Sequence, residues 1–349
     1  MEITKEVKEY YGQQIKKTDD LKTNACCNLN SYPKIYYQNI HDDIKNSYYG
    51  CGLVVPDAIE KCQILDLGCG TGLDVYILSQ MVGSNGSIIG LDMTAEQLSV
   101  ARKHIQWHTE KFGFSQSNVK FIEGYIELLG DYGIEKNSLD VVVSNCVINL
   151  CFDKKKVFQE VYQVLKNGGE FYFSDVYCSR RVPTNLKDNK VLWGECLSGA
   201  LYWNDFENLV RECGFVDPRV VTFNQITINN KELEKLLEGY EFYSVTYRLF
   251  KIDGLEPDCE DYGQAVIYQG SIPGHPNSWN LDSHHEFIKG KISLVCGNTW
   301  KMLNETRFQE HFQFLGNFDT HYGIFPDCGK GNPFSDSENK KNTSSGGCC

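Results

Sequence analysis

The chain has 349 residues, enough for about two domains and for a hydrophobic core that needs neither metals nor disulfides. Its 34 basic and 46 acidic side chains give a net charge of −12, which argues against nucleic acid or an anionic membrane as the main partner. No window reaches the ~18 apolar residues of a membrane span, and residues 1–11 lack the apolar core of a secretory signal, so we expect a cytosolic protein.

Strands and helices alternate through the first half of the chain, because short apolar runs predict strands and 3.6-residue periodicity predicts helices. Thr94 and Gln97 fit a capping box, and residues 167–169 predict a turn before the fifth strand. The alternation predicts an α/β fold, a parallel sheet with helices on both faces. The expected strands are 62–67, 87–91, 119–122, 139–144 and 170–174, and the helices are 73–82, 94–112 and 153–165.

The remaining elements complete this domain, residues 49–252, and add a smaller one. No crossover helix directly precedes the strand expected at 244–252, so it could run antiparallel at the sheet edge. Residues 254–326 predict a small β-rich C-terminal domain. Residues 1–48 form a polar N-terminal segment, and residues 327–349 a disordered tail that ends in two cysteines. The other expected elements are helices at 203–213 and 231–237, and strands at 219–223, 265–268, 285–288 and 292–295.

The most specific motif is the run DLGCGTG at residues 66–72, between the first strand and the first helix. Glycines let the backbone turn tightly and approach a ligand closely. Leu73 stands where a dinucleotide-binding fingerprint needs its third glycine, so a pyrophosphate pocket is not indicated. An acid on the first strand followed by G-x-G-x-G resembles the class I S-adenosylmethionine-dependent methyltransferases, whose sheet is Rossmann-like.

Three later elements match that family in order. Asp92 ends the second strand, 20 residues after Gly72, where an acid takes the ribose hydroxyls. Residues 124–127 follow the third strand, where such enzymes hold adenine, and residues 165–169 match the family's turn before the fifth strand. The resemblance implies S-adenosylmethionine as methyl donor. The residues expected to bind it are Tyr49, Asp66, Gly68, Gly70, Gly72, Asp92, Met93, Ile126, Glu127 and Asn145.

The 15 cysteines are unusual for a cytosolic protein and indicate metal binding, redox chemistry or catalysis, although no Cys-x-x-Cys occurs. Ligands of open α/β sheets bind beyond the carboxyl ends of the strands, where Cys146 follows the fourth strand. Cys51 lies between two glycines before the first strand, and Cys196 follows the fifth. Taken singly, Cys51 is explained equally well as a chance thiol in a loop as by a functional role. Cys196 is explained equally well as a buried small side chain.

Taken together, these cysteines resemble those of the arsenite methyltransferases, particularly the eukaryotic ones. The similarity covers nearly the whole chain. It implies that Cys51, Cys146 and Cys196 bind trivalent arsenic, that Cys26 takes part in redox cycling, and that residues 177–240 belong to the arsenic-binding region. Extra thiols, Cys27 and Cys151, leave open which neighbour forms a disulfide. The matching stretches are residues 23–26, 48–53, 144–150, 173–177 and 191–203.

The chemistry of arsenic agrees with this resemblance. Trivalent arsenic is soft and favours thiolate sulfur, and three thiolates satisfy its three bonds. Its lone pair can attack a sulfonium methyl without a general base, so catalysis is mostly positioning. The implied substrates are arsenite and methylarsenite, detoxified to methylated and dimethylated arsenicals without a metal cofactor. Thioredoxin or glutathione would restore the oxidised cysteines.

Two other functions stay open at this point: methylation of a small organic acceptor, and a thiol-based metalloid-binding or redox-sensing protein. Counting bound arsenic while testing methyl transfer separates all three. His104 and His108, spaced i, i+4, fit a solvated helix face better than a metal site. The cysteines that share no spacing, and to which the sequence assigns no role, are Cys62, Cys178, Cys213, Cys259, Cys296 and Cys328.

Overall fold

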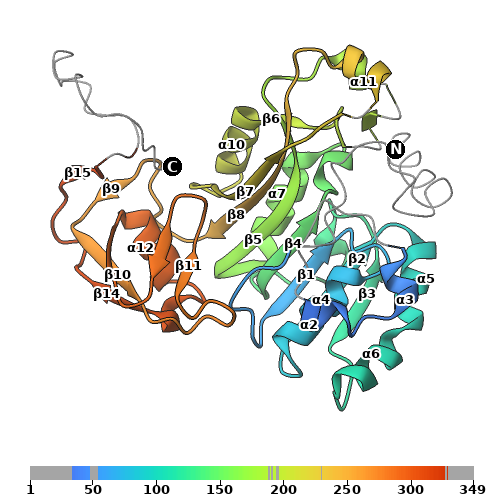
Figure 1. The fold of residues 1–349 in the computed structure, drawn as a ribbon, viewed down its shortest axis with the longest axis horizontal. Coiled ribbons are helices and arrows are strands. Elements are labelled where there is room, and N and C mark those ends of the chain that lie inside the picture. The colour runs from blue at the N-terminus through green and yellow to red at the C-terminus, as the bar shows by residue number, and fades with distance from the viewer. Residues whose placement is uncertain are drawn as a thin grey trace.

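The structure is a computed structural model that describes residues 34–47, 54–187, 189, 192–193, 196–228, 230–326 and 328. Within these residues, an eight-stranded sheet in the order β3-β2-β1-β4-β5-β8-β7 forms the centre, and the short β6 pairs with β5 (Figure 1). Pairing is parallel from β3 to β5 and antiparallel at β8 and β7. The strands are β1 (Gln63–Leu67), β2 (Ser87–Asp92), β3 (Val119–Glu123), β4 (Leu139–Asn145), β5 (Leu165–Cys178), β6 (Leu201–Tyr202), β7 (Arg219–Gln225) and β8 (Phe242–Lys251).

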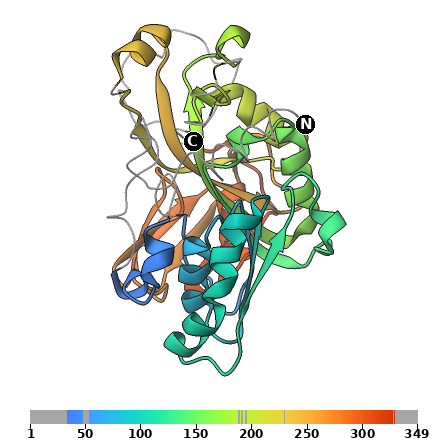
Figure 2. The ribbon, with the colours of Figure 1, turned by 90° about the vertical axis from the view of Figure 1, so that its right-hand side faces the viewer.

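Helices cover both faces of this sheet, as predicted. On one face, α2 (Lys34–Tyr37), α3 (Asp42–Lys45), α4 (Leu73–Val82), α5 (Ala95–Lys103) and α6 (Ile105–Phe112) pack over one apolar core, and they lie in front of the sheet in Figure 2. The opposite core belongs to α7 (Lys154–Val164) and α10 (Trp203–Glu212). A third apolar cluster, beyond the carboxyl end of β5, includes α8 (Thr184–Lys187) and α11 (Lys231–Leu236). The short 3₁₀ turns are η4 (Leu129–Tyr132), η5 (Ile148–Leu150) and η6 (Gln309–His311).

The C-terminal part builds a separate core beside β8, drawn in orange in Figure 1. Its small sheet has β10 (Gln264–Tyr268) between β13 (Ile292–Val295) and β14 (Phe312–Leu315). A hairpin joins β11 (Ser278–Asn280) to β12 (Glu286–Ile288), and β9 (Glu260–Asp261) pairs with β15 (Gly323–Ile324). The helix α12 (Gly297–Asn304) follows β13.

A buried ion cluster joins the two parts. Glu170 on β5 is fully buried and pairs with two arginines, Arg248 on β8 at 2.5 Å between Nε and Oε1, and Arg307 after α12. Arg248 also donates from Nη1 to the carbonyl oxygen of Leu281, at 2.8 Å. Because Glu170 and Arg248 are hidden from water and Arg307 is mostly so, the β-rich part is fixed to the sheet by charge as well as by apolar contact.

Several expectations about the elements are wrong in detail. The helix predicted at 94–112 breaks at His104, and Thr94 makes no side-chain cap, so the capping box is absent. The strand β5 already begins at Leu165, so the turn predicted at 167–169 lies inside a strand. The strand β8 does run antiparallel, but β7 takes the edge instead. None of the described helices has the length and apolar character to cross a membrane.

Candidate active site

The glycine loop between β1 and α4 has the tight conformation that its sequence requires. Gly68, Gly70 and Gly72 have φ angles of 73°, 53° and 87°, which side-chain-bearing residues rarely adopt. A Cβ atom on Gly68 would lie 2.4 Å from Val147 Cγ2, and one on Gly70 would lie 2.7 Å from Gln97 Oε1. Both the conformation and the lack of space therefore demand glycine here.

Three carboxylates surround this loop. Asp92, at the end of β2, accepts hydrogen bonds from the Gly70 amide at Oδ2 and the Thr94 amide at Oδ1, both at 2.8 Å. Asp66 is buried, and its Oδ2 atom has no hydrogen-bond partner among the described residues. Burial, followed by the charges of Asp74 and Asp92, raises the pKa of Asp66 well above its usual range. The site therefore concentrates acceptors and negative charge around one unpartnered oxygen.

Asp74 is a member of this cluster that sequence reasoning missed. It is buried in the first turn of α4, and Asn145 Nδ2 donates to its Oδ2 atom at 3.2 Å. The sequence did contain a signal for it, because Asp74 is an acidic residue only two positions after Gly72, the last glycine of the loop. S-adenosylmethionine carries a sulfonium, an ammonium group and ribose hydroxyls, so this donor-poor, anionic site fits that ligand.

Two of the predicted arsenic ligands come together at the same edge of the sheet. Cys146 and Cys196 are both buried, and the Cys196 thiol donates to the backbone oxygen of Cys146 at 3.4 Å. Both residues have positive φ angles, 55° and 60°, which is costly for a side chain with a Cβ atom. Cys146 is disulfide-bonded in this structure, whereas Cys151 is a free thiol and so is not its partner.

Direct backbone contact brings the Cys196 segment against the loop that follows Cys146. A Cβ atom on Gly199 would lie 2.2 Å from the backbone oxygen of Asn149. The Asn149 side chain donates to the Val176 oxygen at 2.6 Å, and its amide donates to Asp175 Oδ2 at 3.0 Å. Burial raises the pKa of Asp175 to about 6, against the opposing effect of the Val176 and Asn149 backbone amides that donate to its carboxylate.

Other predicted residues have mixed outcomes. Cys26, Tyr49 and Cys51 lie outside the described residues. Of the predicted adenine-binding segment, Ile126 is buried in the apolar core beneath α7 and α10, and the charge of Glu127 adds to burial in raising the pKa of the Cys151 thiol.

Met93, directly after Asp92, is half-buried. The solvated helix face predicted for His104 and His108 is wrong, because both side chains are buried. His104 instead lies near His41 and Asp43.

Comparisons with known proteins identify the family. A methyltransferase-domain model matches residues 59–214, and a model of the arsenite methyltransferase C-terminal domain matches residues 262–349. The arsenite methyltransferase of Aquipseudomonas alcaligenes is 54% identical over 331 residues, 94% of this chain and 95% of that protein. This chain belongs to the arsenite methyltransferase family. The Homo sapiens arsenite methyltransferase is 49% identical over 317 residues, 89% of this chain and 83% of that protein.

A solved arsenite methyltransferase has the same fold. The arsenic(III) S-adenosylmethionine methyltransferase of Chlamydomonas reinhardtii superposes with a TM-score of 0.82 at 46% identity, covering 84% of this chain and 98% of that one. The predicted methyltransferase sheet with a β-rich C-terminal part is thereby confirmed, and so is the predicted enzyme class.

Proposed function

We propose that this arsenite methyltransferase transfers methyl groups from S-adenosylmethionine to trivalent arsenic held by Cys51, Cys146 and Cys196. The proposal rests on one observation: the carboxylate cluster and the arsenic-binding cysteines adjoin at the carboxyl end of β4. Asn145 contacts the carboxylate cluster through Asp74, and the next residue, Cys146, contacts Cys196. A bound cofactor and a thiol-bound arsenic atom would therefore be neighbours.

The chain's own residues act here by positioning. Asp92 fixes the glycine loop through the Gly70 amide, and Asn145 fixes Asp74, so the cofactor-facing groups are held before binding. When bound, S-adenosylmethionine supplies an electrophilic methyl group, toward which arsenic offers its own lone pair. No side chain has to remove a proton from the nucleophile. Asp175, although its pKa is raised, therefore does not have to act as a general base.

The proposed substrates are arsenite and methylarsenite, and the proposed place of action is the cytosol. Methylation oxidises arsenic, and cysteines supply the electrons when they form a disulfide. The disulfide-bonded state of Cys146 supports such a cycle, in which Cys26 takes part and thioredoxin or glutathione restores the thiols. Detoxification of arsenic would be the outcome.

Valence provides a test of the three-cysteine assignment. Methylarsenite has two positions left for sulfur, so one cysteine should be dispensable for the second methylation. Cys146 and Cys196 are fixed by backbone contacts, which makes Cys51 the expected third ligand. Cys51→Ser should lose arsenite methylation but keep methylarsenite methylation, whereas Cys146→Ser and Cys196→Ser should lose both. Product speciation with each substrate and excess small thiol measures this.

Cys213→Ser provides the control, because Cys213 is a buried free thiol elsewhere that donates to the Lys155 oxygen, as serine also can. It should keep both activities. Loss of both activities in Cys51→Ser, or methylarsenite methylation by Cys196→Ser, would contradict the assignment.

A further inference from the structure

The loop that follows β4 is fixed by two consecutive residues of the neighbouring strand β5. The Cys146 amide donates to the backbone oxygen of Ser174 at 2.9 Å. Three residues further along the loop, the Asn149 amide donates to Asp175 Oδ2 at 3.0 Å. The other carboxylate oxygen, Oδ1, accepts from the Val176 amide at 2.8 Å. One buried side chain, that of Asp175, therefore joins the loop to the carboxyl end of β5.

Asn149 extends this contact to the segment that carries Cys196. Its side chain donates to a backbone oxygen of β5 at 2.6 Å, and its own carbonyl oxygen leaves no space for a Cβ atom on Gly199. The Cys196 thiol in turn donates to the backbone oxygen of Cys146 at 3.4 Å. Through Asn149, the Asp175 carboxylate is thus connected to both of the segments on which these cysteines lie.

Both cysteines need such support, because their backbone conformations are strained. Cys146 and Cys196 have φ angles of 55° and 60°, and residues with a Cβ atom hold such angles only where the surroundings fix them. A loop that is no longer held can relax toward ordinary φ angles. The two sulfurs would then move relative to each other, and a pair of ligands for one atom would be lost.

The fold keeps the charge of Asp175 at the expense of stability. Burial raises its pKa to about 6, although backbone amides and the charge of Lys154 oppose this. An acid whose pKa is higher in the folded chain than in the unfolded one lowers the free energy of unfolding as the pH rises to neutrality. Stability alone therefore does not explain why an acid stands at this position.

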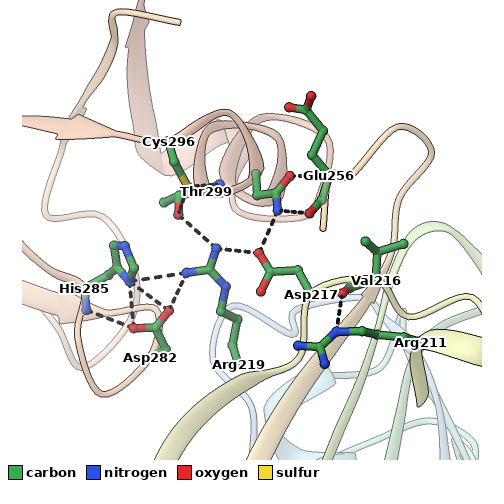
Figure 3. A network of polar contacts seen from close by, with 10 residues as sticks. Arg211, Val216, Asp217, Arg219, Glu256, Asp282, His285, Cys296 and Thr299 are labelled. Atoms are coloured by element: carbon green, nitrogen blue, oxygen red, sulfur yellow. Dashed lines mark hydrogen bonds and ion pairs between the residues drawn. The ribbon is translucent and has the colours of Figure 1, made fainter. Parts of the chain in front are cut away.

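Asp282 has the opposite balance in the C-terminal part, where it pairs with Arg219 and His285 (Figure 3). It is also almost fully buried and accepts from two backbone amides, those of His284 and His285, at 2.9 Å each. Despite burial, the hydrogen bond from His285 and the charge of Arg219 hold the pKa of Asp282 well below its usual range. Asp282 stabilises the fold by its charge, so it provides a matched comparison for Asp175.

We propose that Asp175 is a positioning residue for arsenic methylation, which holds Cys146 and Cys196 at the separation that one arsenic atom requires. It acts through the Asn149 amide. The inference rests on the proposed function in taking both cysteines as arsenic ligands. Asparagine is the replacement that tests it, because asparagine has a similar size but has one acceptor oxygen and presents an NH₂ group to a backbone amide that needs an acceptor.

Kinetics of the full-length chain with excess small thiol test the proposal. Asp175→Asn should lower kcat/KM for arsenite about a hundredfold, because displacements of about 1 Å remove catalysis by positioning. The affinity for S-adenosylmethionine, measured by calorimetry, and the midpoint of urea unfolding should stay unchanged. Asp282→Asn should behave in the reverse way, with a lower urea midpoint but an unchanged kcat/KM for the folded protein.

A double variant tests whether Asp175 acts through the loop. Gly199 contacts the same residue, Asn149, so the losses in Asp175→Asn and Gly199→Ala should not multiply when the two are combined. Multiplied losses, or normal arsenite methylation by Asp175→Asn, would overturn the proposal. A fall of its urea midpoint as large as that of Asp282→Asn would also do so. Normal arsenite methylation by Cys196→Ser would instead contradict the proposed function.

Discussion

At the scale of single residues, the site depends on side chains whose oxygens serve two partners. Asp92 accepts from two backbone amides, which fixes its carboxylate at the mouth of the glycine loop. Each carboxylate oxygen has a second lone pair, so ribose hydroxyls can still bind. The sequence could predict Asp92 because its distance from the loop is set by one β-α-β unit. It could not predict the bonds that hold Asp92 in place.

Replacing Asp92 tests this arrangement. Asp92→Ala should weaken S-adenosylmethionine binding about tenfold to a hundredfold, because a charge-assisted contact of roughly 1.5–3 kcal/mol is lost. Titration calorimetry measures the affinity, and circular dichroism checks the fold. Asp131→Ala, at an exposed position of η4, is the control and should bind normally. An unchanged affinity in a folded Asp92→Ala protein would remove this residue from the site.

The glycine at position 199 offers a sharper test of cysteine placement. In Gly199→Ala, the new Cβ atom meets the Asn149 oxygen at 2.2 Å, so the segment that carries Cys196 must move away. We expect about a hundredfold slower arsenite methylation, since catalysis by positioning is lost with displacements of about 1 Å. Binding of S-adenosylmethionine should persist.

Gly130→Ala is the matched control, because its Cβ atom would meet nothing closer than Glu160 Oε2 at 4.0 Å. Comparable slowing in that variant, or normal turnover in Gly199→Ala, would show that the contact does not place Cys196.

At the scale of elements, His108 joins α6 to α3. His108 Nε2 accepts from the His41 amide at 3.2 Å, and Nδ1 faces the His104 oxygen at 2.8 Å, so the ring is a neutral Nδ1–H tautomer. The ring also stacks on Tyr76, with centroids 3.7 Å apart. Helical spacing places His104 and His108 on one face of the chain. The sequence did not indicate that this face would be covered, because α2 and α3 are too short to show a helical pattern.

Burial lowers the pKa of His108 from 6.5 to about 4, so acid should destabilise the fold. Between these values the unfolded chain binds more protons than the folded one, and stability is lost as the pH falls below 6.5. Urea unfolding should show a loss of about 1–2 kcal/mol from this group between about pH 7.5 and pH 5. His108→Phe, which keeps the stacking, should reduce that difference. The same pH dependence in both proteins would exclude His108 as its source.

At the scale of the whole molecule, features that depend on local sequence pattern could be predicted, whereas features that depend on contacts between distant segments could not. The parallel pairing of the first five strands follows from their alternation with helices, and a parallel sheet with helices on both faces was predicted on that basis. The edge position of β7 and the helix α12 were not, because neighbours from distant segments decide them. Cys259, Cys296 and Cys328 illustrate the same limit, since nothing local indicates that they meet.

The buried ion cluster should control how the two parts hold together. Glu170→Gln leaves the Arg248 and Arg307 guanidiniums without their shared counter-charge, so we expect the free energy of unfolding to fall by about 3–5 kcal/mol. Glu212→Gln, which breaks the exposed pair with Lys155, should have a far smaller effect. Urea titration compares the two variants. Equal losses would show that burial adds nothing to the Glu170 contacts.

The positive φ angles of Cys146 and Cys196 have an evolutionary consequence. Glycine or asparagine would adopt these conformations with less strain, so the backbone conformation gives no reason to keep cysteine at either position. Most mutations are tolerated until stability or function falls below a threshold, and here arsenic binding adds to apolar packing in protecting the thiols. A descendant of this chain released from selection by arsenic should therefore lose these two cysteines early, while its glycine loop and sheet persist.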